Sequence, residues 1–231
     1  MKPPLSQRLL ACCSFVAPGA HIIDIGCDHG YLGIHLLKYS LARSVIAADI
    51  NEGPLQCAMR NTQKYGIHSG ISFFLSDGVK SIPQDFDVLV CAGMGSDTMV
   101  SIISAAPWLQ SSQYRLILQC QSKTHLLRQY LSENGWYIAK EQVLKDGKFL
   151  YTVMECIWQP GHVLTVGGYY FPAVLLDSPS QAVSAYYHRI IHGLEIAVSN
   201  QKTQVDPMKA LALNELKTLP EKFQWLKEDS Q

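Results

Sequence analysis

A loop of glycines and carboxylates is the part of the sequence best suited to chemistry. Residues 22–30 read IIDIGCDHG, an apolar run followed by a turn sequence. The residues of that turn are candidates for contact with a cofactor: Asp24, Gly26, Cys27, Asp28 and Gly30. Gly26 and Gly30 allow the backbone to turn sharply and to approach a ligand closely. A strand that ends in such a loop before a helix is the usual context of a nucleotide-like cofactor site.

Asp28 narrows the choice of ligand. In the dinucleotide loop G-x-G-x-x-G, bare backbone amides at a helix N-terminus hold a pyrophosphate, and an added carboxylate would repel it. Asp28 stands at the position of the middle glycine of that pattern. S-adenosylmethionine (SAM) has no phosphate and presents an ammonium and a sulfonium instead. The loop therefore favours SAM over NAD, and an ordinary glycine turn is the third interpretation.

Two more acids follow the next two predicted strands. Asp49, with Ile50 beside it, is expected to accept hydrogen bonds from ribose hydroxyls, although an acid at a strand end is also a common turn or cap residue. Asp77, with Gly78 after it, is expected to meet the adenine amine of the cofactor, and a plain Asp-Gly turn is the alternative. Ligands of open α/β sheets bind at the carboxyl ends of the strands, where these acids are expected to gather.

The substrate is expected to approach the same edge. Ala92 and Gly93, at the end of the fourth predicted strand, are further cofactor candidates. This turn lacks the Asn/Asp-Pro-Pro-Tyr sequence of enzymes that methylate exocyclic amines, which disfavours that mechanism. The candidates for catalysis or for contact with the substrate are Asp28, His29, Tyr31, Gly93, Met94 and Gln119. Gln119 and Gln121 can hydrogen-bond a base edge or serve a purely structural purpose, and Tyr31 can equally pack a helix start.

Charge gives little support to a nucleic-acid partner. The chain has 19 basic and 19 acidic residues and a formal net charge of zero. Six residues are candidates for a local phosphate-facing surface, and an ordinary solvated face is the favoured interpretation of each one taken alone. The candidates are Lys123, His125, Arg128, Lys140, Lys145 and Lys148.

Composition indicates a soluble cytoplasmic protein with a sizeable core. Of the 231 residues, 48% are hydrophobic and 16% are charged. The seven cysteines form no Cys-x-x-Cys pair, which favours reduced thiols and predicts no metal site. The first residues lack the apolar core of a signal peptide, and no apolar run is long enough to span a membrane.

Alternating strands and helices must position these residues. Strands are predicted over residues 21–25, 44–48, 71–75, 86–91 and 115–120, and helices over 5–15, 31–40, 54–65, 96–105 and 124–133. Residues 136–144 and 149–158 flank an Asp-Gly step and predict a hairpin. This order predicts a Rossmann-like α/β domain over residues 1–160, with a mostly parallel sheet and an antiparallel edge strand, typical of class I methyltransferases.

The rest of the chain, residues 161–231, is predicted to form a separate coiled-coil-like helical hairpin. Its helices are expected over 180–200 and 207–227, with a break at 203–206.

Several motifs together resemble the bacterial TrmK family, the tRNA (adenine-22-N1)-methyltransferases. They are LSQRL near the start, IIDIGCDHGYL, Asp49 followed by Gly53–Pro54, SDG at 76–78, AGMG at 92–95 and LILQ at 116–119. The resemblance covers about residues 5–158, and the predicted hairpin is similar to that family's coiled-coil appendage. The chain departs from the family in having Asp49 for a common Glu, Ser96 for a second Gly, and Gln119–Cys120–Gln121 for a Gln-Pro-Asn turn.

The resemblance implies methyl transfer from SAM to N1 of adenine 22 of tRNA. N1 lies on the Watson–Crick edge, so the target base must be unpaired or extruded. The hairpin is then expected to support the tRNA body. We separately expect the protein to be a monomer.

Three alternatives remain open. The first is a SAM-dependent methyltransferase that acts on another RNA, on a protein or on a small molecule. The second is a catalytically silent SAM-binding protein, and the third is an NAD-dependent dehydrogenase.

Overall fold

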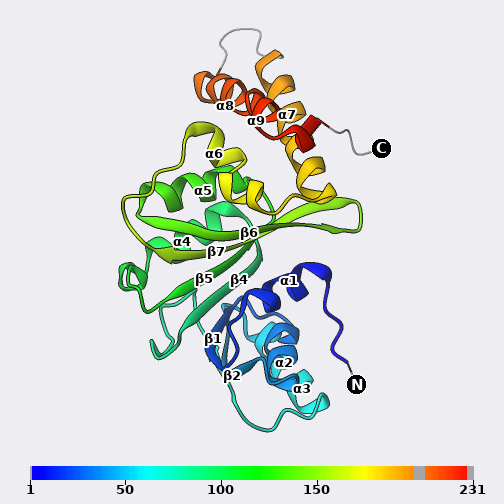
Figure 1. Cartoon of the computed structure of the whole chain (residues 1–231). Helices are drawn as coiled ribbons and strands as arrows, with labels where there is room; N and C mark the ends of the chain where they lie inside the picture. The colour runs from blue at the N-terminus through cyan, green and yellow to red at the C-terminus, as the bar shows by residue number, and fades with distance from the viewer. Residues whose placement is uncertain (1, 200–205, 228–231) are drawn as a thin grey trace.

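The computed structural model describes residues 2–199 and 206–227. Within them, seven strands form one sheet in the order β3-β2-β1-β4-β5-β7-β6 (Figure 1). The strands are β1 (Ala20–Ile25), β2 (Ala42–Asp49), β3 (Ile71–Leu75), β4 (Val88–Met94), β5 (Arg115–Cys120), β6 (Trp136–Asp146) and β7 (Phe149–Trp158). The helices that connect the first six strands are α2 (Tyr31–Lys38), α3 (Glu52–Lys64), α4 (Ser96–Ser104), the short η1 (Pro107–Leu109) and α5 (Thr124–Glu133).

The sheet is parallel from β3 to β5, and its strand order reverses beside β1. Ile23 of β1 is paired with Ile46 of β2 on one side and with Leu89 of β4 on the other. A ligand crevice forms at the carboxyl ends of the strands where the order reverses in this way. The sequence therefore directs the loop after β1 to the place where the topology opens a site.

The reversed strand is β7, which pairs antiparallel with both β5 and β6. Because β6 is parallel to β5 and lies one strand away, the returning β7 fills the gap between them. The predicted fold class is confirmed, with β7 one position in from the edge and β6 at the edge itself.

Helices cover both faces of the sheet. On one face α1 (Gln7–Phe15) and α2 bury Cys12, Leu32 and Leu36 against strand residues such as Val45 and Val90. Parallel strands covered in this way are apolar on both faces, as β1 is. A strand that is apolar on both faces appears in the sequence as a continuous apolar run, and such runs predicted the strand positions.

On the opposite face, α4 and α5 pack Met99, Ile103 and Leu127 against Ile46 and Leu118. The sheet is thus buried between two helical layers.

The C-terminal elements stack beyond β6, at the end of the molecule opposite α2 and α3 (Figure 1). They are α6 (Val166–Tyr170), η2 (Ala173–Asp177), α7 (Gln181–Ser199), α8 (Pro207–Lys217), α9 (Leu219–Lys222) and η3 (Gln224–Lys227). Their apolar cluster includes Val143 of β6 beside Leu175, Tyr186 and Leu213. The appendage therefore shares a core with the sheet, and its independence as a domain over 161–231 stays a prediction.

The prediction of one continuous helix over 207–227 is wrong. The helix ends at Lys217, and Pro220 lies in the first turn of α9. Proline lacks an amide hydrogen and its ring clashes with the preceding turn, so it is tolerated at a helix start and breaks a helix interior. Asn200 and most of the predicted break at 203–206 lie outside the described residues.

Arg128 of α5 fastens the appendage to the sheet. Its side chain is fully buried, so both interpretations of this residue, a solvated face and a phosphate-facing surface, are wrong. The five guanidinium N–H groups have five acceptors. Nε and Nη2 bond the Glu141 carboxylate of β6 at 3.2 and 2.5 Å, and Nη2 also bonds the Tyr186 hydroxyl at 3.1 Å. Nη1 bonds the carbonyls of Tyr169 and Tyr170 at 3.0 and 2.9 Å.

Burial alone would lower the pKa of Arg128, and the adjoining Glu141 carboxylate reverses this and raises it. Arg128 therefore stays charged in the interior, and its hydrogen bonds join α5, β6, α6 and α7.

Replacing Arg128 should destabilise the whole protein. Arg128→Met leaves Glu141 as an uncompensated buried charge, which costs about 3–5 kcal/mol of unfolding free energy. Urea denaturation followed by circular dichroism measures this loss. The double variant Arg128→Met/Glu141→Met should recover most of it, whereas Arg43→Met, at an exposed position, should change little. An unchanged denaturation midpoint for Arg128→Met would contradict this account of the network.

Candidate functional site

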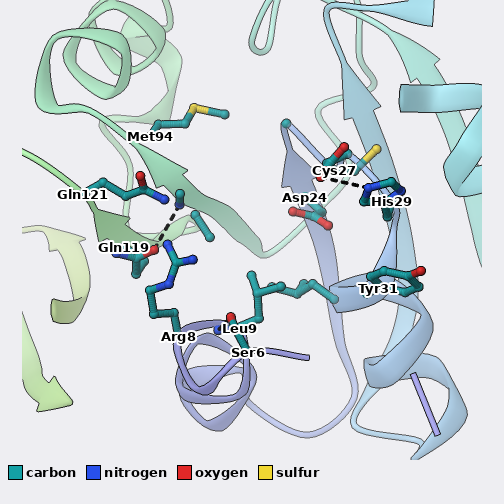
Figure 2. Close-up of a pocket in the computed structure, with 15 residues that line it drawn as sticks. Ser6, Arg8, Leu9, Asp24, Cys27, His29, Tyr31, Met94, Gln119 and Gln121 are labelled. Carbon is teal, nitrogen blue, oxygen red and sulfur yellow. Dashed lines mark hydrogen bonds and ion pairs between the residues drawn. The ribbon is translucent and has the colours of Figure 1, made fainter. Parts of the chain in front are cut away.

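A cavity of about 410 Å³ opens at the carboxyl ends of β1, β4 and β5 (Figure 2). It brings together most of the candidates from the sequence, joined by residues of α1 and α2. The lining consists of Ser6, Arg8, Leu9, Asp24, Gly26, Cys27, Asp28, His29, Tyr31, Leu32, Ala92, Gly93, Met94, Gln119 and Gln121. Arg8 and the two glutamines lie on one side, facing Asp24, His29 and Tyr31 on the other (Figure 2).

The loop after β1 depends on its glycines. Gly26, Asp28 and Gly30 have φ angles of +71°, +49° and +69°. A side chain at Gly26 would collide with Met94 Cε, and one at Gly30 would come within 2.9 Å of Ala58 Cβ on α3. Both positions therefore need glycine for two reasons: the positive φ angle favours it, and there is no room for a side chain.

Hydrogen bonds hold this loop against β2. The amides of Gly26 and Cys27 donate to the Ala48 carbonyl at 2.8 and 3.0 Å. The Asp28 amide donates to Asp49 Oδ2 at 3.2 Å, and the Asn51 amide donates to Asp49 Oδ1 at 2.9 Å. Asp49 thus fixes the unusual conformation of Asp28 as well as the start of α3.

Asp24 is the buried acid of the cavity. Its carboxylate projects into the space between the two sides (Figure 2) and the residue is 4% exposed. Burial, followed by the nearby charge of Asp49, raises the pKa of Asp24 to about 7. A cation that enters the cavity would favour its ionised form.

Five of the cofactor candidates lie outside the cavity lining: Gly30, Asp49, Ile50, Asp77 and Gly78. Asp49 is connected to the lining through Asp28, and Ile50 is exposed beside it. Asp77 is exposed and forms an ion pair with Lys80 at 2.5 Å, one turn along the chain. Gly78 has a φ of +59°, and an added side chain would crowd Ile102. The roles of Asp49 and Asp77 toward ribose and adenine stay predictions.

Gln119 fixes the turn at the end of β4. It is fully buried, its Oε1 accepts the Gly93 amide at 3.1 Å, and its Nε2 donates to the Cys120 carbonyl at 3.1 Å. Gly93 has a φ of +81°, and the β4–β5 register shifts between Ala92 and Met94. The side-chain amide of Gln119 therefore orients this turn. Of the two interpretations, contact with a base edge or a structural purpose, the structure supports the second.

His29 and Tyr31 form the rim beside the loop. Their rings stack with centroids 5.6 Å apart, and His29 Nδ1 lies 3.0 Å from Cys57 Sγ on α3. His29 Nε2 is 3.7 Å from the Asp28 carboxylate. Met94 covers the loop from the opposite side, with Sδ 3.3 Å from Cys91 Sγ. Aromatic and sulfur-containing side chains therefore line the sides of the cavity, and carboxylates lie beneath them.

Sequence reasoning did not assign Ser6, Arg8, Leu9 and Leu32 to the site. Arg8 is the only lysine or arginine in the lining. Its Nε bonds Asp146 Oδ2 at 3.1 Å and its guanidinium lies 4.9 Å from the Tyr151 ring centroid, both at the tip of the β6–β7 hairpin. The LSQRL motif was the available signal, but it carried no indication of which partner Arg8 would face.

The candidates for a phosphate-facing surface do not lie together on one face. Lys123 and His125 line a groove beside the cavity, whereas Lys140 lies on β6 and pairs with Glu155 at 3.7 Å. Lys145 and Lys148 are exposed at the hairpin tip.

Known proteins share this arrangement. The methyltransferase domain family model matches residues 5–154. The putative tRNA methyltransferase MG248 of Mycoplasma genitalium is 33% identical over 136 residues, which are 58% of this chain and 60% of that protein. The tRNA (adenine(22)-N(1))-methyltransferase of Bacillus subtilis is 31% identical over 151 residues, 65% of this chain and 63% of that protein. The matched segments thus span about 60% of these relatives.

Solved structures match over almost the whole length. Streptococcus pneumoniae Sp1610, a putative tRNA (m1A22) methyltransferase, has a TM-score of 0.79 at 27% identity, covering 97% of this chain and 98% of that chain. The same protein was also solved in complex with SAM, with a TM-score of 0.77 at 26% identity and the same coverage. The B. subtilis m1A22 tRNA methyltransferase TrmK has this fold too, with a TM-score of 0.77 at 24% identity, again covering 97% and 98%. The B. subtilis relative and the Sp1610 structure support the resemblance of this chain to the TrmK family. The chain therefore belongs to the methyltransferase domain family.

Proposed function

We propose that this protein is an enzyme that transfers the methyl group of SAM to N1 of adenine 22 of tRNA. The observation that carries the proposal is the cavity, which sets the Asp24 carboxylate opposite the Arg8 guanidinium at the carboxyl edge of the sheet. The matched relatives named for this reaction and the SAM complex of Sp1610 support it.

The residues of the cavity fit SAM. Asp24 would accept the ammonium group of its methionine portion, and Arg8 would hold the carboxylate. Gly26 and Gly93 allow the backbone to approach closely, and Asp49 is available beside the loop for ribose hydroxyls. Asp28 makes the same loop unfavourable for a pyrophosphate, which favours SAM over NAD.

SAM supplies an electrophilic methyl group, and the chain must position the acceptor. Adenine N1 already has a nucleophilic lone pair, so alignment for in-line displacement contributes much of the acceleration. Tyr31, His29 and Met94 offer a rim against which an extruded base can pack. The methylated ring is cationic, and the carboxylate of Asp28 would stabilise it.

Two other functions differ in what they predict. A SAM-dependent enzyme acting on another substrate would label ribosomal RNA, protein or a small molecule, and a silent binding protein would label nothing. Incubating wild-type protein and labelled SAM with bulk tRNA, ribosomal RNA and cell protein separates them. We expect the labelled methyl group in tRNA alone. Label found only in ribosomal RNA or only in protein would contradict the proposal that tRNA is the substrate.

We also propose that the enzyme acts as a monomer in the cytoplasm. Across the described part of the chain, no helix is both long and apolar enough to span a bilayer.

The binding of SAM should depend on the protonation of Asp24. With a pKa of about 7 in the free protein, Asp24 must release a proton when an ammonium group binds beside it. Affinity should therefore rise with pH, by up to about tenfold per unit below that pKa, and level off above it. Calorimetric titrations at about pH 6, 7 and 8, in buffers of different ionisation enthalpy, measure both the affinity and the released proton.

Asp24→Asn supplies the matched comparison. It should bind SAM more weakly and lose the Asp24-dependent part of the pH effect. A raised pKa means that the Asp24 charge opposes folding as pH rises from about 4 to 7, so the variant should have a higher Tm than wild type at about pH 8 without SAM. Unchanged SAM affinity in a folded Asp24→Asn protein would remove Asp24 from the site.

The helical hairpin is proposed to support the tRNA body. Deletion of residues 180–231 is a poor test, since it would remove Tyr186 from Arg128 and expose the shared core. Charge reversal of two exposed lysines, Lys222→Glu with Lys227→Glu, leaves that core intact. We expect weaker tRNA binding by filter assay and a smaller salt dependence, with unchanged SAM affinity. Equal tRNA affinity and salt dependence would argue against this surface.

A further inference from the structure

A second hollow, of about 430 Å³, adjoins the cavity. The two share Gln121, at the carboxyl end of β5. The groove then runs between the start of α5, the tip of the β6–β7 hairpin, α6 and α7. Whatever occupies it lies immediately beside the proposed site of methyl transfer.

The groove is basic although the chain as a whole is neutral. Its charged lining residues are Lys123, Arg128 and Arg189, with no aspartate or glutamate among the lining. Arg128 is neutralised by Glu141, and Lys123 forms an exposed pair with Asp97 at 3.1 Å, which is weak in solvent. Arg189 is held in place, with Nη1 donating to the Leu150 carbonyl at 3.0 Å and the guanidinium 5.0 Å from the Tyr186 ring centroid.

Flat rings also line the groove. Phe149, at the hairpin tip, is 52% exposed, so its ring is open to a stacking partner. His125 and Tyr170 form a parallel stack with centroids 4.6 Å apart and an interplanar angle of 8°. Burial and the neighbouring cations Arg128, Lys209 and Lys123 lower the pKa of His125, so its ring is neutral near pH 7.

Exposed rings and cations, in a lining that contains no acid, suit a single-stranded nucleic acid. Bases stack on rings, and cations neutralise phosphates. An adenine extruded into the cavity necessarily carries its neighbouring nucleotide along the backbone to the cavity's edge.

We propose that this groove binds the nucleotide next to the target adenine, with its base against Phe149 and its phosphate near Arg189 and Lys123. The inference rests on the proposed function and deepens it. It also gives the appendage a part in the active site, because Arg189 belongs to α7.

The test compares Phe149→Ala and Arg189→Ala with Lys64→Ala, an exposed lysine at the last position of α3. Phe149→Ala should raise the KM for full-length tRNA roughly tenfold or more, because a lost base stack weakens binding by about that factor. Arg189→Ala should raise the KM through the lost phosphate contact. Arg189→Ala should also reduce the slope of log affinity against log salt by about 1, whereas Phe149→Ala should leave the slope unchanged. Phe149→Trp should retain wild-type binding, and SAM affinity should be equal in all variants.

A crosslink locates the nucleotide directly. Benzoylphenylalanine placed at position 149 of the full chain should, on irradiation with tRNA, react within one or two nucleotides of the methylated adenine. Two results would overturn this inference and leave the proposed function standing. One is a KM for tRNA in the groove variants equal to that of Lys64→Ala, while the wild-type protein methylates tRNA. The other is a crosslink far from the methylated base. If the wild-type protein methylates another class of molecule, such as a protein, both are overturned.

Discussion

The reversal of the chain between β1 and α2 is the constraint on which the site depends. Three of its residues, Gly26, Asp28 and Gly30, adopt positive φ angles, and Asp28 does so with a side chain, at a cost of about 1–3 kcal/mol. Hydrogen bonds from the loop to Ala48 and Asp49 of β2 offset that cost. Asp24, which β1 places just before the loop, lies in the lining of the cavity, and α2 begins directly after the loop with Tyr31 at the rim.

Distant parts of the chain complete the site around this loop. Arg8 comes from the first helix and is held by the hairpin tip, while Arg128 joins the hairpin strand β6 to α6 and α7. The acids of the two hollows are divided within a neutral molecule: the lining of the proposed cofactor cavity contains Asp24 and Asp28 beside Arg8, and the lining of the adjoining groove contains cations and no acid. This separation suits a cationic cofactor and an anionic substrate that meet at Gln121.

The sequence predicted those parts of the structure that depend on neighbouring residues. Apolar runs located the strands, and the glycine and aspartate spacing located the loop, because strand burial and left-handed turns leave local patterns. Arg8 and Arg128 were not assigned correctly, since their partners Asp146 and Tyr186 are far along the chain. The predicted length of the final helix was too great. The helical spacing of apolar residues continues past Pro220, but proline has no amide hydrogen to continue the helical hydrogen bonding, and the helix ends at Lys217.

Locating the transferred methyl group tests the central claim most directly. Transfer RNA lacking N1-methyladenosine would be incubated with the wild-type protein and SAM, digested, and analysed by mass spectrometry, with reverse-transcription stops marking the modified position. The account predicts N1-methyladenosine at nucleotide 22 and at no other adenine. A methyl group on another atom or nucleotide, or SAM binding without any modified adenine, would contradict it.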